Sequence, residues 1–327
     1  MAKAALSYMP ALRCAFMPRA ELEALVTAEL HTPVVAPITA FATQLATARP
    51  GALAVLFYGS NLRSGDLEGV LDFYVLVDGL REWHGAALSA AANHLLPPNV
   101  GYHEWMHEGR PLRAKVAVLR LDQFQRGVSG TGIDTTLWAR FTQPARLLWA
   151  RDTAAAKAAG AAVAEAVITA SRWAAGLGPV QGASSDYWDA LFARTYAAEL
   201  RVEKTTRAAS LTAHDPARYH AALTAAWSAA GVAFSVSAEG GLQPAVSEVQ
   251  RRQAHQGWAR RARWGKPLNL LRLTKSVFTF AGGADYVAWK VERHSGYRIP
   301  LTDWQRRHPL LAAPRVLWTL WRRGVLR

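Results

Sequence analysis

Apolar residues follow two different spacings in the first part of the chain. Over residues 20–48 they recur at helical intervals, which predicts one helix that ends before Pro50-Gly51. Dense apolar runs at 53–58, 70–77 and 114–121 instead predict buried strands.

Polar and helical stretches separate these runs. Residues 61–69 predict a loop after the first strand, and residues 81–95 predict a helix after the second. A further helix is expected from Asp122, whose carboxylate is suited to cap it. Strand, loop, strand, helix, strand and helix in this order are typical of an α/β unit.

The pattern becomes helical after residue 150. Helices are predicted at 153–175, 186–212 and 216–230, and the Gly- and Ser-bearing stretch 231–247 predicts a loop or a short hairpin. Basic helices that carry tryptophan follow.

These shifts predict an α/β + α fold in three consecutive parts. We expect an α/β domain at 1–149, a helical domain at 150–247 and a basic C-terminal region at 248–327.

Composition excludes some classes of protein. The 327 residues are 51% apolar and 19% charged, as in ordinary globular domains. Because Cys14 is the single cysteine, one chain holds neither a disulfide framework nor a cysteine-rich zinc site. No run of about 18 uncharged apolar residues predicts a membrane span, and the alanine-rich stretch 156–170 comes closest.

The formal net charge of +14 indicates an anionic partner, which is nucleic acid, anionic lipid or a polyphosphate. This charge is concentrated late in the chain. Residues 249–284 contain no acid but eight Lys and Arg residues, and no acid follows Asp303.

The candidate chemistry begins at Tyr58-Gly59-Ser60, which is followed after 11 residues by Asp72. A strand that ends in Gly-Ser lets the backbone approach phosphate oxygens closely. An aspartate on the neighbouring strand can then hold Mg²⁺ against those phosphates. This is the order of motifs in nucleotidyltransferases, in which an acid-x-acid pair follows the Gly-Ser turn.

One acid of that pair is missing, because Tyr74 stands at its position. Asp66, Glu68 and Asp78 remain open as the source of a second carboxylate. The alternative is that Gly-Ser is a plain turn and Asp72 pairs locally. A lone aspartate in an apolar strand favours the functional interpretation, since burying it without a cation or partner is costly.

Several motifs occur together in a fixed order: Tyr58-Gly59-Ser60, Leu71-Asp72-Phe73, Val77-Asp78 and Glu82-Trp83-His84. Together they closely resemble the mitochondrial-type phosphatidate cytidylyltransferases. These are the translocator-assembly-and-maintenance CDP-diacylglycerol synthases, which also have bacterial members. That family likewise lacks the second acid. Residues 114–118 and 273–290 are similar to its lysine-bearing strand and its C-terminal region.

The resemblance implies a nucleotidyltransferase domain, a winged-helix-like helical domain and a C-terminal region that engages the membrane. It implies that CTP and phosphatidate are the substrates, that Mg²⁺ is the cofactor and that no nucleic acid is bound. By matching position, the implied roles are phosphate or nucleotide binding by Tyr58, Gly59 and Ser60, Mg²⁺ binding by Asp72, and charge neutralisation by Lys115 and Arg201. The alternatives are a surface salt bridge for Arg201 and, as a minority interpretation, a general base at His84.

The last residues predict a helix that lies on a membrane. Trp318 and Trp321 fall on an apolar side of 314–327, and Arg322 and Arg323 fall on the other. This pattern is typical of an interfacial helix on anionic lipid. We expect a peripheral protein on the cytoplasmic face of a bacterial inner membrane, or on the matrix side of the mitochondrial inner membrane in a eukaryote. The alternative is a helix that docks on the core.

Two other functions remain open. In the first, the protein is a nucleotidyltransferase whose acceptor is another lipid phosphate, a sugar phosphate or an RNA end. The second is a non-catalytic protein that binds nucleic acid or anionic lipid through the basic C-terminal region. The sequence does not predict the oligomeric state.

Overall fold

The computed structural model describes residues 19–198, 211–280, 282–297 and 299–307, together with residues 311, 312, 318 and 322. They form two compact units. The sheet unit comprises 33–121, 146–153 and the described residues from 271 onward. The helical unit comprises the described residues up to 32, 122–145 and 154–270. Each unit joins stretches that are separate in sequence, and the three consecutive domains stay a prediction.

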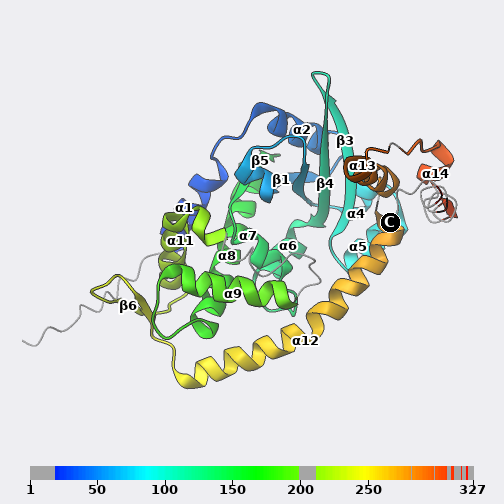
Figure 1. The fold of residues 1–327 in the computed structure, drawn as a ribbon. Coiled ribbons are helices and arrows are strands. Elements are labelled where there is room, and N and C mark those ends of the chain that lie inside the picture. Colours follow the sequence, from blue (N-terminus) through cyan, green and yellow to red (C-terminus); the bar gives the residue numbers. More distant parts are fainter. Residues whose placement is uncertain are drawn as a thin grey trace, which may run out of the picture. The chain divides into compact units, whose positions relative to one another are not determined.

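A five-stranded mixed sheet and a largely helical second part confirm the α/β + α class (Figure 1). The strand order is β3-β4-β2-β1-β5. Strand β2 pairs antiparallel with β1 and parallel with β4, and β3 pairs antiparallel with β4. The strands are β1 (Ala52–Tyr58), β2 (Val70–Val77), β3 (Asn99–His107), β4 (Arg110–Arg120) and β5 (Ala145–Ala150).

The three predicted strands are confirmed as β1, β2 and β4, whereas β3 and β5 were not predicted from the apolar pattern. Strand β3 mixes apolar residues with polar ones such as His103 and Glu104, and in its second half exposed and half-buried residues alternate. Strand β5 is short and contains Arg146. Neither is a dense apolar run, so pairing with β4 and β1 determines their conformation.

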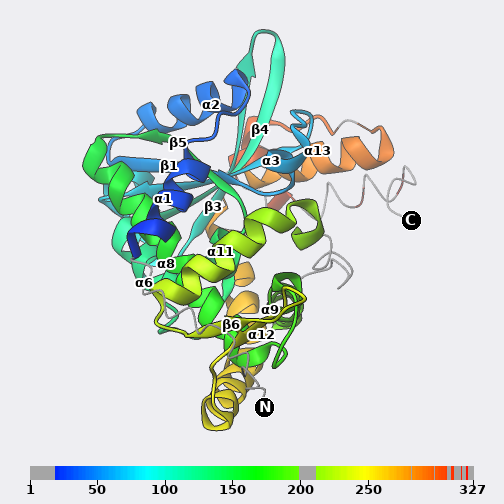
Figure 2. The same cartoon turned by 90° about the vertical axis from the view of Figure 1, so that its left-hand side faces the viewer.

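One face of the sheet carries the core of the sheet unit. Helix α2 (Ala36–Thr47) lies along this face (Figures 1 and 2). The ring of Phe41 meets the ring of Phe73 edge-on, with centroids 5.8 Å apart, and both side chains are fully buried. Because strand side chains alternate between faces, Phe73 and Val75 point toward the core while Asp72 and Tyr74 point to the opposite face.

The prediction of a single helix over 20–48 is wrong. The chain forms α1 (Arg19–Leu30) in the helical unit and α2 in the sheet unit. Pro33 lacks the amide hydrogen that a continuing helix needs, and Pro37 lies in the first turn of α2, where that hydrogen is not needed.

Two other predicted segments are also divided. The helix over 81–95 is two helices, α4 (Leu80–His84) and α5 (Ala87–Leu95). The loop over 61–69 begins with one short helix, α3 (Ser60–Ser64).

The C-terminal segment of the sheet unit is tied to the turn that leads into β3. Helix α12 (Glu248–Thr279) enters this unit at Leu271. The ammonium group of Lys275 donates to the carbonyls of Leu96 and Pro98 at 2.6 and 2.7 Å, and to Oδ1 of Asn99 at 2.9 Å. Burial, and secondly the charge of Arg272, lower the pKa of Lys275 to about 8.

Helix α13 (Gly283–Ser295) follows and packs against β3. Gly282, at φ +72°, precedes it, and a Cβ there would collide with the carbonyl oxygen of Tyr102. Only glycine therefore lets the chain pass so close to the strand. Helix α14 (Asp303–Arg307) is joined to α13 by the ion pair of Arg306 with Asp285, at 2.9 Å.

The helical unit is built around buried aromatic residues. The ring of Tyr187 meets that of Trp227 edge-on at 5.0 Å, and Trp188 donates its Nε1 hydrogen to the carbonyl of Tyr219. The short hairpin predicted within 231–247 is confirmed as β6 and β7. The elements are α6 (Leu121–Val128), α7 (Thr136–Phe141), α8 (Thr153–Leu177), α9 (Ser184–Ala198), α11 (Pro216–Ala229), β6 (Phe234–Val236) and β7 (Leu242–Pro244), with α1 and most of α12.

Helix α8 contains the alanine-rich stretch at 156–170. Among the described residues it is the one helix long and apolar enough to cross a membrane. However, 56% of its most apolar 18-residue window is buried, and core helices of soluble proteins pass the same test. Length and composition of α8 are therefore weak evidence for a membrane span.

Candidate functional site

Four side chains form a line across the sheet, on the face opposite α2. Tyr58 of β1 pairs with Asp72 of β2, Asp72 pairs with Lys115 of β4, and Lys115 pairs with Tyr102 of β3. Residues paired in this way point to the same face, about 5 Å apart from strand to strand. This cross-sheet row brings together three residues predicted from the sequence and adds Tyr102, which was missed with its strand.

Gly59 lies directly against Asp72. Its backbone φ of +99° is rarely adopted by residues other than glycine, and a Cβ there would lie 2.8 Å from Oδ2 of Asp72. Ser60 follows as the exposed first residue of α3. The backbone of the Gly-Ser turn is thus held next to a half-buried carboxylate, as the motif predicted.

Asp72 is the acidic residue of the cross-sheet row and could contribute a carboxylate to a cation. Among the described residues, no group of three or more His, Cys, Asp or Glu side chains is suited to hold a metal. Asp78, considered as a second ligand, lies at the other end of β2 and pairs with Arg151 at 2.7 Å, so that possibility is wrong. Mg²⁺ is often held by one or two carboxylates together with substrate phosphates. Asp72 fits that kind of site and does not form a preformed metal cage.

Lys115 is held by the C-terminal segment of the same unit. Its Nζ lies 4.6 Å from the ring centroid of Tyr286 on α13, a cation–π distance. The Tyr286 ring lies 5.4 Å from that of Tyr102. Helix α13 therefore contributes an aromatic ring next to the cross-sheet row. The sequence of α13 did not predict this contact, apart from containing aromatic residues.

Tyr102 and Arg113 share one carboxylate beside the row. The hydroxyl of Tyr102 donates to Oε1 of Glu104 at 2.7 Å, and Nε of Arg113 lies 3.3 Å from the same oxygen. Burial, followed by Glu104, raises the pKa of Tyr102, which keeps its phenol protonated. Arg113 also lies two residues before Lys115, on the same face of β4.

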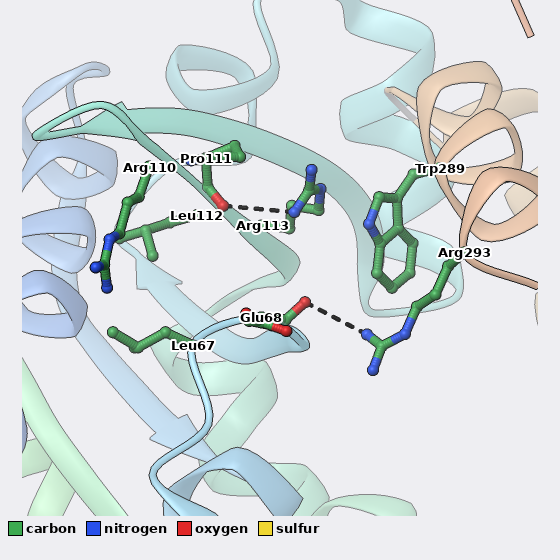
Figure 3. Close-up of a pocket in the computed structure, with 8 residues that line it drawn as sticks. All are labelled: Leu67, Glu68, Arg110, Pro111, Leu112, Arg113, Trp289 and Arg293. Atoms are coloured by element: carbon green, nitrogen blue, oxygen red, sulfur yellow. Dashed lines mark hydrogen bonds between the residues drawn. The ribbon is translucent and has the colours of Figure 1, made fainter. Parts of the chain in front are cut away.

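A groove of about 610 Å³ adjoins this end of the row (Figure 3). Arg113 and Arg293 lie on either side of the indole of Trp289, with guanidinium carbons 5.5 and 5.4 Å from its ring centroid. The groove is lined by Leu67, Glu68, Arg110, Pro111, Leu112, Arg113, Trp289 and Arg293.

His84 does not join the row. Its Nε2 lies 2.8 Å from the amide nitrogen of Asn93, which also donates to the carbonyl of Val118. Val118 is three residues beyond Lys115 along β4, or about 10 Å. Burial, followed by the charges of Arg49 and Lys275, lowers the pKa of His84 to about 4. The neutral imidazole has a packing role here.

Other predicted site residues are only partly described. Arg201, Trp321 and Arg323 lie outside the described residues. Trp318 is 55% exposed, and the guanidinium carbon of Arg322 lies 4.8 Å from its ring centroid.

Part of the basic stretch on α12 has a structural role. In the helical unit, Arg261 is buried and donates to the carbonyls of Gly130 and Gly132 at 2.6 and 2.9 Å. Arg251 donates to two carbonyls at the end of α8, those of Gly178 and Pro179. Both guanidinium groups bind backbone carbonyls, so fewer cations are available to an anionic partner than the sequence suggests.

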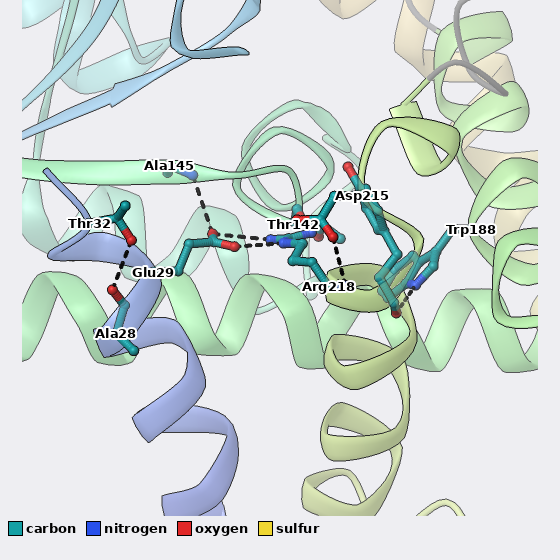
Figure 4. Close-up of polar contacts among 9 residues, drawn as sticks. Ala28, Glu29, Thr32, Thr142, Ala145, Trp188, Asp215 and Arg218 are labelled. Atoms are coloured by element: carbon teal, nitrogen blue, oxygen red, sulfur yellow. Dashed lines mark hydrogen bonds and ion pairs between the residues drawn. The ribbon is translucent and has the colours of Figure 1, made fainter. Parts of the chain in front are cut away.

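The helical unit also contains a polar cluster that links α1 and α11 (Figure 4). Nε of Arg218 lies 2.6 Å from Oε2 of Glu29, and the same guanidinium donates to the carbonyl of Thr142. Burial alone would lower the pKa of Arg218, but the adjacent Glu29 carboxylate raises it. Every member has a protein partner, so this cluster holds the unit together.

No model of a known protein family matches the chain, and no curated protein matches it. The cross-sheet row and its surroundings are therefore the basis of the proposed function.

Gly59→Ala tests the close approach to Asp72. We expect it to lower the free energy of unfolding by about 2 kcal/mol or more, since the added methyl group is strained and meets the carboxylate. Gly65→Ala is the control, because its φ is also positive but nothing lies within 4 Å, and about 1 kcal/mol is expected. Chemical denaturation checks both variants, and equal losses would contradict the contact.

Proposed function

We propose that this protein is a nucleotidyltransferase that converts CTP and phosphatidate into CDP-diacylglycerol and diphosphate at a membrane surface. The observation that carries the proposal is the approach of Gly59 to Asp72 within the cross-sheet row. A glycine turn for phosphates, a carboxylate for a cation and a lysine for phosphate charge are the groups that this reaction requires.

The reaction joins two phosphates. An oxygen of the phosphatidate phosphomonoester forms a bond to the α-phosphorus of CTP, and the bond from that phosphorus to the α,β-bridging oxygen breaks. Diphosphate leaves with the bonding electron pair. The phosphomonoester is already ionised at neutral pH, so the step needs little base catalysis, which agrees with the structural role of His84.

Each residue of the site has a role in this proposal. Gly59 and Ser60 offer backbone hydrogens to the nucleotide phosphates beside Tyr58, and Lys115 offsets phosphate charge. Asp72 would hold Mg²⁺, which neutralises charge on the departing diphosphate when bound. Arg201 is proposed as a further phosphate ligand.

The finer description of the fold belongs to the same proposal. The sheet unit is taken as nucleotidyltransferase-like, since a glycine turn follows β1 and an acid lies on β2. The helical unit is taken as winged-helix-like, because the β6–β7 hairpin follows α11.

Exposed apolar side chains support attachment to an anionic membrane. They belong to the C-terminal segment of the sheet unit, which also carries exposed cations such as Arg293 and Arg322. Apolar groups beside cations are typical of a peripheral membrane surface. We propose the cytoplasmic face of a bacterial inner membrane, or the matrix side in a mitochondrion. The exposed side chains are Leu271, Leu273, Phe278, Val287, Trp304, Leu311 and Trp318.

Asp72→Asn tests the catalytic proposal. We expect CTP-dependent CDP-lipid formation to fall at least about 100-fold, because the amide cannot replace the carboxylate at the cation. Asp78→Asn is the matched control one residue beyond the other end of β2, with activity near wild type. The measurement is incubation with labelled CTP, Mg²⁺ and phosphatidate vesicles, followed by lipid extraction.

Full activity in Asp72→Asn would refute the role of this carboxylate. A panel of other lipid phosphates, sugar phosphates and RNA ends tests the acceptor. Product from one of these, and none from phosphatidate, would keep the nucleotidyltransferase and replace its substrate. The absence of any product from wild type would favour a non-catalytic binding protein.

Phe278→Asp combined with Trp318→Asp tests the membrane proposal. We expect flotation with vesicles of phosphatidylcholine and phosphatidylglycerol to fall at least about fivefold, since both apolar anchors are replaced by anions. Met106→Asp is the control, because Met106 is also exposed but lies on β3. Unchanged flotation of the double variant would contradict the proposed surface.

A further inference from the structure

The groove beside the cross-sheet row has a strongly cationic lining (Figure 3). Three guanidinium groups, those of Arg110, Arg113 and Arg293, face it, whereas Glu68 is the one carboxylate among its lining residues. Arginine presents a planar fork of donors that matches two oxygens of a phosphate or carboxylate. The lining therefore favours an anion with several oxygens.

The same groove also offers apolar contact. Trp289 is half-buried between its two arginines, and the half-buried Leu67 also lines the groove. A small hydrophilic anion would leave these apolar groups in contact with water, so an anion attached to an apolar body fits better.

The register of β4 fixes where the anion would lie. Arg113 precedes Lys115 by two residues on one face, so their Cα atoms are about 7 Å apart. Leu67 and Glu68 lie just before β2, which brings Asp72 to the row. An anion on Arg113 would thus be next to a nucleotide on the row, as a transfer between two bound substrates requires.

We propose that this groove is the acceptor site, and that it binds the phosphomonoester of a phospholipid. Arg113 and Arg293 hold the phosphate oxygens, and Trp289 orients both guanidinium groups and contacts the apolar part of the lipid. A backbone contact helps to position one of these arginines, since Arg293 donates a hydrogen bond to the carbonyl oxygen of Glu68 at 3.3 Å. The assignment rests on the proposed nucleotidyl transfer for its place in the reaction, but binding of a phosphomonoester lipid does not.

Arg293→Met tests the site, with Lys290→Met as the control. Both side chains are exposed cations on α13, but only Arg293 lines the groove. We expect Arg293→Met to raise the KM for phosphatidate about tenfold or more, with the KM for CTP unchanged within about twofold. Arg113→Met should act in the same direction. Because Arg113 also contacts Glu104, the exposed Arg293 carries the test if that variant does not fold.

Binding without CTP separates this site from the proposed function. Calorimetry with dihexanoyl phosphatidate should show binding to wild type and about tenfold weaker binding to Arg293→Met. Dihexanoyl phosphatidylcholine, which lacks a phosphomonoester, should not bind. Loss of binding in Arg293→Met together with a catalytically inactive wild type would retain the groove and refute the transferase. Normal catalysis with an unchanged KM for phosphatidate in Arg293→Met would refute the groove alone.

Glycerol 3-phosphate distinguishes the lipid from a soluble phosphate. It has the same phosphomonoester without acyl chains, so it should bind wild type at least about tenfold more weakly than dihexanoyl phosphatidate. Equal affinity for the two would overturn the lipid part of the proposal.

Discussion

Two cationic side chains hold the end of α12 in the sheet unit against the turn before β3. Lys275 donates to two carbonyls and one amide oxygen in the turn before β3, and Arg272 donates to the carbonyl of Pro97 in the same turn. Hydrogen bonds from a charged donor are stronger than those from a neutral donor. Replacing Lys275 by an apolar residue would therefore take this donor away from all three of its oxygen acceptors. This contact fixes the end of α12, and the position of α13 follows from it.

The candidate site depends on that position. Strands β1, β2 and β4 supply Tyr58, Asp72 and Lys115, while α13 supplies Tyr286 next to Lys115 and Trp289 next to Arg113. The proposed nucleotide site and the proposed acceptor groove therefore share β4 and α13. The proposed transferase needs its two substrates side by side, and in this arrangement the proposed places for the triphosphate and the phosphomonoester lipid are adjacent.

The sequence predicted the parts of the site that depend on local pattern. Dense apolar runs predicted β1, β2 and β4. The Gly-Ser turn after β1, followed by an aspartate in the next apolar run, indicated Gly59 and Asp72 as site residues. Tyr102, Trp289 and Arg293 were not predicted, because β3 has no dense apolar run and the role of α13 arises from packing against distant strands. The basic stretch on α12 was overvalued, since Arg251 and Arg261 bind backbone carbonyls. Charge counting cannot separate such arginines from those that meet a ligand.

Hydrogen exchange of α13 in Lys275→Met tests most directly whether the hydrogen bonds of Lys275 maintain this site. Loss of the ammonium should reduce the protection of the α13 amides roughly 10- to 100-fold. The amides of β1 and β2 should exchange as in wild type. Lys290→Met, an exposed lysine on α13 itself, should change neither. Wild-type protection of α13 in Lys275→Met would contradict the account, because the helix would then keep its place without the contact.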